Sequence, residues 1–188
     1  MFRYTVVGVL LLSSAVALAD TPSYSYVQAS YVDVSVDLGG GFDADGDGFG
    51  VAGSVAINDQ WHIFADYSSA DLESVLDLDL TTIGAGYRHG ISDTTNVFAE
   101  LGYAKVDVQF AGDDSGLSAR VGIRSMINSN LEVYGSVGTL DFDDVDWGAE
   151  FGAGAWYTVS GNFALGADVR FSDDVTRFGL GVRLYFDK

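Results

Sequence analysis

The sequence contains no cysteine, which excludes disulfide bonds and thiolate metal sites. Proline is nearly absent too: Pro22 is the single example among 188 residues, so no proline-rich linker divides the chain. Basic residues are also scarce, with 9 lysines and arginines against 27 acidic residues and a formal net charge of −18. This balance argues against a nucleic-acid partner, because phosphate backbones attract lysine and arginine.

Long apolar runs are missing beyond the N-terminus, although 48% of the residues are hydrophobic. A membrane-spanning helix needs about 20 consecutive apolar residues, so a helical membrane protein is disfavoured. Aromatic residues reach 13%, whereas disordered acidic chains are depleted in them. The hydrophobic residues are therefore expected in short, ordered segments.

The N-terminus has the organisation of a secretory signal peptide. Arg3 supplies a positive charge, residues 5–12 form a short apolar stretch, and Ala17 and Ala19 supply the small residues of a cleavage site. We expect a signal peptide at 1–19 and one exported domain at 20–188.

Beyond that segment, apolar and polar residues alternate with period two in segments typical of a transmembrane β-barrel. The alternation and the turn residues between segments predict strands near 23–37, 47–57, 61–70, 78–90, 96–108, 117–127, 131–141, 147–158, 162–171 and 176–186. We predict an all-β fold, a transmembrane antiparallel up-and-down β-barrel of about ten strands. A barrel of eight strands is the alternative.

The connections alternate in length. Those at 58–60, 91–95, 128–130 and 159–161 are short, and most of the others are longer and rich in aspartate. Bacterial barrels have short periplasmic turns and longer extracellular loops. We therefore expect a multi-pass protein of the cell outer membrane, with both termini in the periplasm and most acidic residues in extracellular loops.

The charges within strands share the parity that the alternation assigns to the lumen. A charge that faces lipid at the bilayer midplane costs about 2–4 kcal/mol, so these side chains are expected inside. The predicted lumen ion-pair network comprises Arg88, Arg120, Arg124, Arg170, Arg177, Arg183, Asp66, Glu100, Glu132, Glu150 and Asp168. We interpret it as a salt-bridged plug; a charged selectivity lining of a channel is the alternative.

An aspartate-rich segment resembles the start of a calcium-binding loop. Asp43, Asp45 and Asp47 alternate with small residues, and Gly48 follows. The bidentate glutamate of such loops is missing, because Ser54 stands at the twelfth position. We expect no cofactor beyond loosely bound divalent cations, which would bridge the acidic rim to lipopolysaccharide phosphates.

Four segments carry a family resemblance: YSYV at 24–27, DGDGFGV at 45–51, WHIFADYS at 61–68 and GVRLYF at 181–186. Together they resemble small proteobacterial outer-membrane β-barrel proteins of the OmpA/OmpX-like, porin-like type. The last segment also resembles the β-signal read by the barrel assembly machinery, with Gly181, Leu184 and Phe186 at matching positions. The resemblance implies that this machinery is a partner during insertion.

The resemblance implies no catalytic residue. Related outer-membrane enzymes use histidine near the outer rim, whereas His62 and His89 fall at predicted periplasmic strand ends. A nucleophile also needs a base within hydrogen-bond distance. We therefore predict no enzymatic activity, and an outer-membrane hydrolase ranks last.

These observations predict a non-enzymatic outer-membrane β-barrel protein that serves envelope structure or surface interaction through acidic extracellular loops. A narrow channel for ions or small solutes is the alternative function. Outer-membrane lipid and lipopolysaccharide are the expected partners, and the barrel is expected to be a monomer.

Overall fold

A computed structural model describes residues 21–37, 40–41, 43–72, 76–109, 112–142 and 146–186. The predicted signal peptide at 1–19 lies outside these residues. Within them, no helix is long and apolar enough to cross a membrane.

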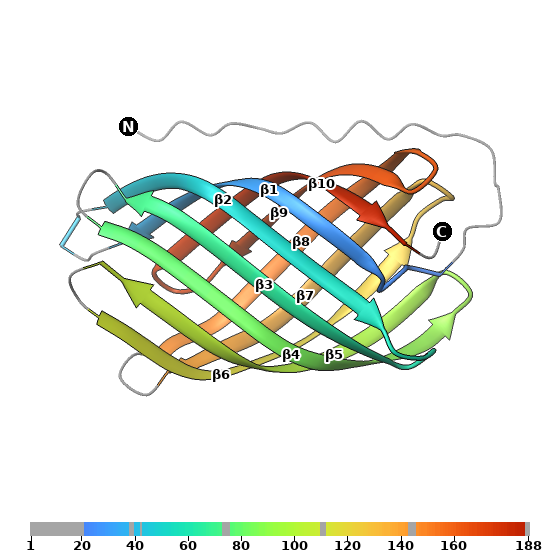
Figure 1. The fold of residues 1–188 in the computed structure, drawn as a ribbon, viewed down its shortest axis with the longest axis horizontal. Coiled ribbons are helices and arrows are strands. Elements are labelled where there is room, and N and C mark those ends of the chain that lie inside the picture. The colour runs from blue at the N-terminus through green and yellow to red at the C-terminus, as the bar shows by residue number, and fades with distance from the viewer. Residues whose placement is uncertain are drawn as a thin grey trace.

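Ten antiparallel strands form a closed barrel in which each strand pairs with its chain neighbours and β1 pairs with β10 (Figure 1). The strands are β1 (Tyr26–Asp37), β2 (Asp43–Ala56), β3 (Trp61–Leu72), β4 (Leu76–Ser92), β5 (Thr95–Val108), β6 (Gly112–Met126), β7 (Leu131–Phe142), β8 (Asp146–Ser160), β9 (Phe163–Phe171) and β10 (Val175–Tyr185). The predicted ten-stranded up-and-down barrel is confirmed, and the eight-stranded alternative is excluded.

One end of the barrel carries only tight turns, and we call it the short-turn end. In the β2–β3 turn, the side-chain oxygen of Asn58 accepts the backbone N–H groups of Gln60 at 2.9 Å and Trp61 at 2.8 Å. Asn128 repeats this arrangement with Asn130 and Leu131 in the β6–β7 turn, both at 2.9 Å. The longer connections predicted for the opposite end are mostly strand, since only three to five residues separate the strands there. These strands nevertheless extend beyond the apolar belt before they connect. Bacterial barrels extend less on the periplasmic side, so we assign the short-turn end to the periplasm and the opposite end, which we call the long-loop end, to the outside.

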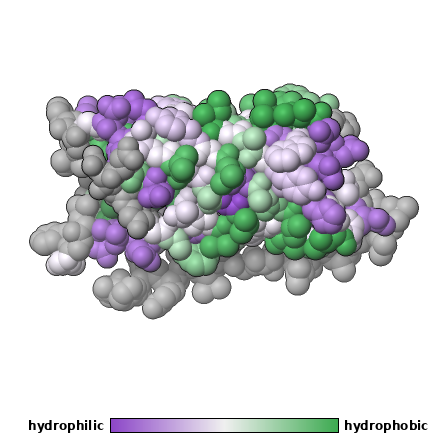
Figure 2. Space-filling model, turned by 90° about the horizontal axis from the view of Figure 1, so that it is seen from below, coloured by the Kyte–Doolittle hydropathy of each residue, from purple (hydrophilic) through white to green (hydrophobic). Residues whose placement is uncertain are grey.

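Apolar side chains cover the middle of the outer wall, and polar side chains gather toward both ends (Figure 2). Aromatic residues pair across neighbouring strands: the Trp61 and Tyr87 rings lie 5.1 Å apart near the short-turn end. Nearer the other end, the Phe49 and Tyr67 rings lie 5.8 Å apart. Paired aromatic belts are typical of a barrel wall that meets two membrane interfaces.

The polarity of the wall reverses at the long-loop end. On the outside, four exposed aspartates lie side by side across strands in the pairs Asp33–Asp47, Asp47–Asp71 and Asp71–Asp77. Inside, apolar side chains form two buried clusters. One contains Ala104, Val106, Leu140 and Phe142, and the other contains Val34, Ala70 and Leu72. The barrel thus continues beyond the apolar belt with water-facing carboxylates outside and an apolar interior.

This apolar interior explains why several strands are longer than predicted. β2 begins at Asp43 instead of residue 47, and β6 begins at Gly112 instead of residue 117. Backbone pairing continues through these segments opposite Val34 and Val106, which lie in the apolar clusters above the membrane belt.

Strand β1 differs in the other direction, since it begins at Tyr26 and not at residue 23. Residues 21–25 form no strand, and Pro22, Ser23 and Tyr24 are buried. The segment leaves the wall because the Tyr24 ring contacts Arg124 and His62 in the lumen.

Candidate functional site

A buried cluster of charged and aromatic side chains fills the short-turn end of the lumen. Glu132 on β7 is 1% exposed and accepts two hydrogen bonds from Arg124, from Nε at 3.1 Å and from Nη2 at 2.6 Å. Arg183 Nη1 donates to the same carboxylate at 3.2 Å, and the Tyr185 hydroxyl donates at 3.3 Å. One carboxylate therefore compensates two guanidinium groups.

Aromatic rings complete the cluster. The Arg183 guanidinium lies 4.0 Å from the centre of the Trp156 ring and 4.1 Å from that of Tyr26. Trp156 and Tyr185 are fully buried, so rings and ion pairs occupy this part of the lumen together. Cation–π contacts stabilise more strongly when they are shielded from water, as they are here.

The segment before β1 closes the cluster from the periplasmic side. The Tyr24 ring lies under two guanidinium groups, Arg124 at 4.2 Å and Arg88 at 4.6 Å, and 4.7 Å from the His62 ring. The Ser23 carbonyl accepts a 2.8 Å hydrogen bond from Arg124 Nη2. Burial raises the pKa of Tyr24 to about 12, as expected for a phenol that is shielded from water. We call residues 21–25 the N-terminal plug.

A second ion-pair group lies deeper in the barrel. Glu100 on β5 is 2.9 Å from His62 Nε2 through one oxygen and accepts a 2.8 Å hydrogen bond from Arg120 Nε through the other. His62 is fully buried, and the Phe64 ring lies 5.9 Å from the Arg120 guanidinium. This group reaches from β3 across β5 to β6 and narrows the lumen above the plug.

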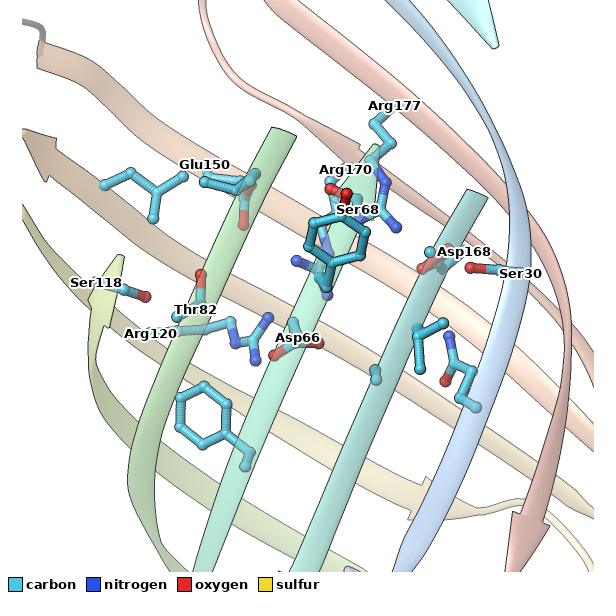
Figure 3. A pocket seen from close by; sticks show the side chains of 18 of the residues that line it. Ser30, Asp66, Ser68, Thr82, Ser118, Arg120, Glu150, Asp168, Arg170 and Arg177 are labelled. Carbon is cyan, nitrogen blue, oxygen red and sulfur yellow. The ribbon is translucent and has the colours of Figure 1, made fainter. Parts of the chain in front are cut away.

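The middle of the lumen is a polar chamber lined by charged residues that do not pair closely. Asp66, Glu150, Asp168, Arg170 and Arg177 line it together with Arg120 (Figure 3). Within the described part of the chain, none of the first five forms an ion pair within 4.0 Å. Charged groups separated in this way are typical of a hydrated space.

The structure thus divides the predicted lumen network into separate groups. Arg124, Arg183 and Glu132 meet at the plug, and Arg120 meets Glu100 above them. The chamber residues line one space without direct pairing. Arg88 forms no ion pair with a carboxylate among the described residues and instead donates from Nε to the Asp59 carbonyl at 2.9 Å, at the β2–β3 turn.

Three aromatic or histidine side chains of the plug region were not among the predicted site residues: Tyr24, His62 and Trp156. His62 and Trp156 occupy strand positions that alternate toward the lumen, so the sequence alternation could have identified them as lumen residues. Tyr24 has the inward parity of the predicted strand 23–37 as well, but its contacts depend on the chain leaving the wall at residues 21–25, which the alternation does not predict. His89, the other histidine, is exposed.

The remaining predicted residues lie on the wall. Asp43, Asp45 and Asp47 occupy alternate, exposed positions of the regular strand β2 and not a loop, and no group of three acidic or histidine residues among the described positions is arranged to hold a metal ion. Gly181 lies in β10 against β1, where an added Cβ would be 2.6 Å from the Ala29 carbonyl oxygen. Leu184 and Phe186 point outward and are exposed on the wall.

Solved structures share this architecture at low sequence identity. A KdgM porin, solved with disordered oligogalacturonate, superposes with a TM-score of 0.51 and 13% identity over 86% of this chain and 99% of the porin. The translocator domain of the autotransporter NalP from Neisseria meningitidis has a TM-score of 0.50 and 10% identity, covering 88% of this chain and 90% of that domain. No curated protein sequence matches this chain. At such identities the structural likeness establishes the fold alone.

A match to a sequence family assigns this chain to a protein family, which structural likeness at such low identity does not do. Residues 5–146 match the family described as the outer membrane protein beta-barrel domain. The match spans most of the chain and agrees with the closed barrel and its apolar outer belt. The protein therefore belongs to the outer membrane protein beta-barrel domain family and is a transmembrane barrel of the outer membrane.

Proposed function

We propose that this protein is a non-enzymatic, closed barrel that serves the envelope as a structural and surface-interaction element and does not act as a channel. The observation that carries the proposal is the buried cluster at the short-turn end, where Arg124 and Arg183 both contact Glu132. Ions that cross the lumen would have to break these pairs, and breaking a buried pair is costly. The N-terminal plug covers the same cross-section.

Planar-bilayer recording tests this proposal. Protein whose folding is verified by heat-modifiable migration on a gel is inserted, and the current is followed at increasing voltage. The proposal expects no conductance steps. Reproducible steps of one size from the folded protein would refute it.

A narrow channel is the second candidate, and the polar chamber favours it. Rings of charge select ions in channels, and Asp66, Arg170 and Arg177 face this space without an ion pair within 4.0 Å to any described residue. This function requires the plug to leave the short-turn end. The same recording distinguishes the two candidates, because a channel whose plug opens gives intermittent steps.

The surface-interaction part of the proposal concerns the four aspartates of the outer rim, Asp33, Asp47, Asp71 and Asp77. Like charges directly opposite across strands repel each other, and lipopolysaccharide phosphates add further negative charge around this rim. We propose that loosely bound divalent cations bridge the two anionic surfaces.

A further inference from the structure

The upper lumen contains a slot with apolar walls and a cationic floor. Its walls include Val34, Ala70 and Leu78, and Arg170 and Arg177 form the side nearest the polar chamber. We propose that this slot binds a small organic monoanion, with a carboxylate against the two guanidinium groups and a short apolar body between the walls. This inference goes beyond the closed-barrel function and does not depend on the plug.

The two arginines lie against each other without a close counter-ion among the described residues, although Asp66, Glu150 and Asp168 line the adjoining chamber. Arg170 and Arg177 are direct cross-strand partners on β9 and β10, an arrangement in which like charges destabilise each other. Neither forms an ion pair within 4.0 Å in the described part of the chain. The Nε atom of Arg177 is also buried without a hydrogen-bond partner. A carboxylate would accept from this donor and offset the repulsion between the guanidinium groups.

The backbone opposite the arginines leaves room for this arrangement. A Cβ at Gly50 would lie 3.1 Å from Arg177 Nη2 and 2.9 Å from Ser30 Oγ, so a guanidinium and a hydroxyl occupy the space over this glycine. Ser68 also borders both the slot and the chamber. Figure 3 shows Arg170, Arg177 and Ser68 gathered in one part of the lumen. Donors from four strands therefore converge beside the apolar walls.

Glu150 restricts the charge of the ligand. Its side chain lines the slot and the chamber, on the same level as the arginine pair. Among the charged residues that line the slot itself, one carboxylate faces two guanidinium groups, so a monoanion balances these three charges and a dianion such as phosphate exceeds them. The apolar walls distinguish an organic anion from chloride or acetate, because buried methylene groups add affinity.

The test compares three water-soluble probes on the folded protein in nanodiscs by titration calorimetry, with empty nanodiscs subtracted. Hexanoate carries both features, acetate lacks the apolar body, and hexanamide lacks the charge. We expect saturable hexanoate binding, with acetate and hexanamide each weaker by about tenfold or more. Absence of hexanoate binding, or equal affinity for hexanoate and either other probe, would overturn the proposal.

Two variants locate the site, with one matched control. Arg177→Gln is expected to weaken hexanoate binding by about tenfold or more, since it removes a charged donor. Lys105→Gln removes an exposed cation of the outer wall and should leave binding unchanged. Leu78→Ser changes the wall alone, so it should weaken hexanoate and not acetate, and it keeps the test decisive if Arg177→Gln fails to fold. Unaltered hexanoate binding in both slot variants would place the ligand elsewhere and refute the site.

The outcome is separable from that of the closed-barrel proposal. Conductance steps together with saturable hexanoate binding would refute closure and leave the slot intact. A bilayer without conductance steps, together with no hexanoate binding, would support closure and refute the slot.

Discussion

Glu132 shows how a barrel interior accommodates charge at the scale of one residue. Its carboxylate is 1% exposed, yet it accepts from Arg124, Arg183 and Tyr185. Each guanidinium also lies over an aromatic ring, which replaces part of the lost hydration. Removing the carboxylate leaves two buried cations without their counter-ion.

We predict that Glu132→Gln lowers the free energy of unfolding by about 3–5 kcal/mol, because it breaks a buried pair from one side. Urea titration of folding into lipid vesicles measures this change. Glu150→Gln is the matched control, since Glu150 also faces the lumen but forms no ion pair within 4.0 Å in the described chain. Equal losses in the two variants would contradict the importance of the Glu132 pairs.

Sequence parity placed the strand charges on the lumen side, because a strand alternates its faces and lipid excludes charge. Parity does not say which acid meets which base. Glu132 serves two arginines, and Arg88 meets backbone carbonyls, because strand register and side-chain reach decide these contacts. The contribution of His62 was missed for the same reason.

At the scale of the strand, the outer face changes character within a few residues. On β2, Phe49 and Val51 are exposed on the apolar belt, whereas Asp47 on the same face pairs across strands with Asp33 and Asp71. The interior changes in the opposite sense, with buried Val34 and Val106 at the long-loop end. The change on both faces marks the membrane boundary on each strand.

This boundary predicts different costs for the same substitution at two positions of β2. Val51→Lys should lower the free energy of unfolding in vesicles by about 2–4 kcal/mol, because the charge faces lipid. Asp47→Lys should be neutral or stabilising, because it places a cation between two aspartates. Similar costs at both positions would show that the boundary does not lie between them.

All ten predicted strands are present because the two-residue period is strong throughout the membrane belt. Their ends were less predictable. The start of β2 at Asp43 depends on an apolar interior that the neighbouring strands β1 and β3 supply, and the absence of residues 23–25 from β1 depends on lumen partners of Tyr24. Both are tertiary effects that a local pattern does not contain.

At the scale of the whole molecule, the charge of −18 is distributed unevenly. Arg120, Arg124, Arg170, Arg177 and Arg183 share the lumen with carboxylates, and exposed aspartates line the outer rim. We predict that magnesium raises the melting temperature more in vesicles containing lipopolysaccharide than in phosphatidylcholine vesicles, because bridging needs phosphates on both sides. Equal shifts in the two membranes would contradict the proposed bridge.

The central claim is that the N-terminal plug and the Glu132 cluster seal the lumen, and a single cysteine tests it most directly in this cysteine-free chain. Ser54 faces the lumen near the plug and is 4% exposed, whereas Asn58 is exposed in the neighbouring turn. In nanodiscs, Ser54→Cys should react with a charged thiol reagent about two orders of magnitude more slowly than Asn58→Cys, because labelling requires transient opening. Adding Tyr24→Ala should remove most of that protection. Equal rates for Ser54→Cys and Asn58→Cys with Tyr24 in place would contradict a sealed lumen.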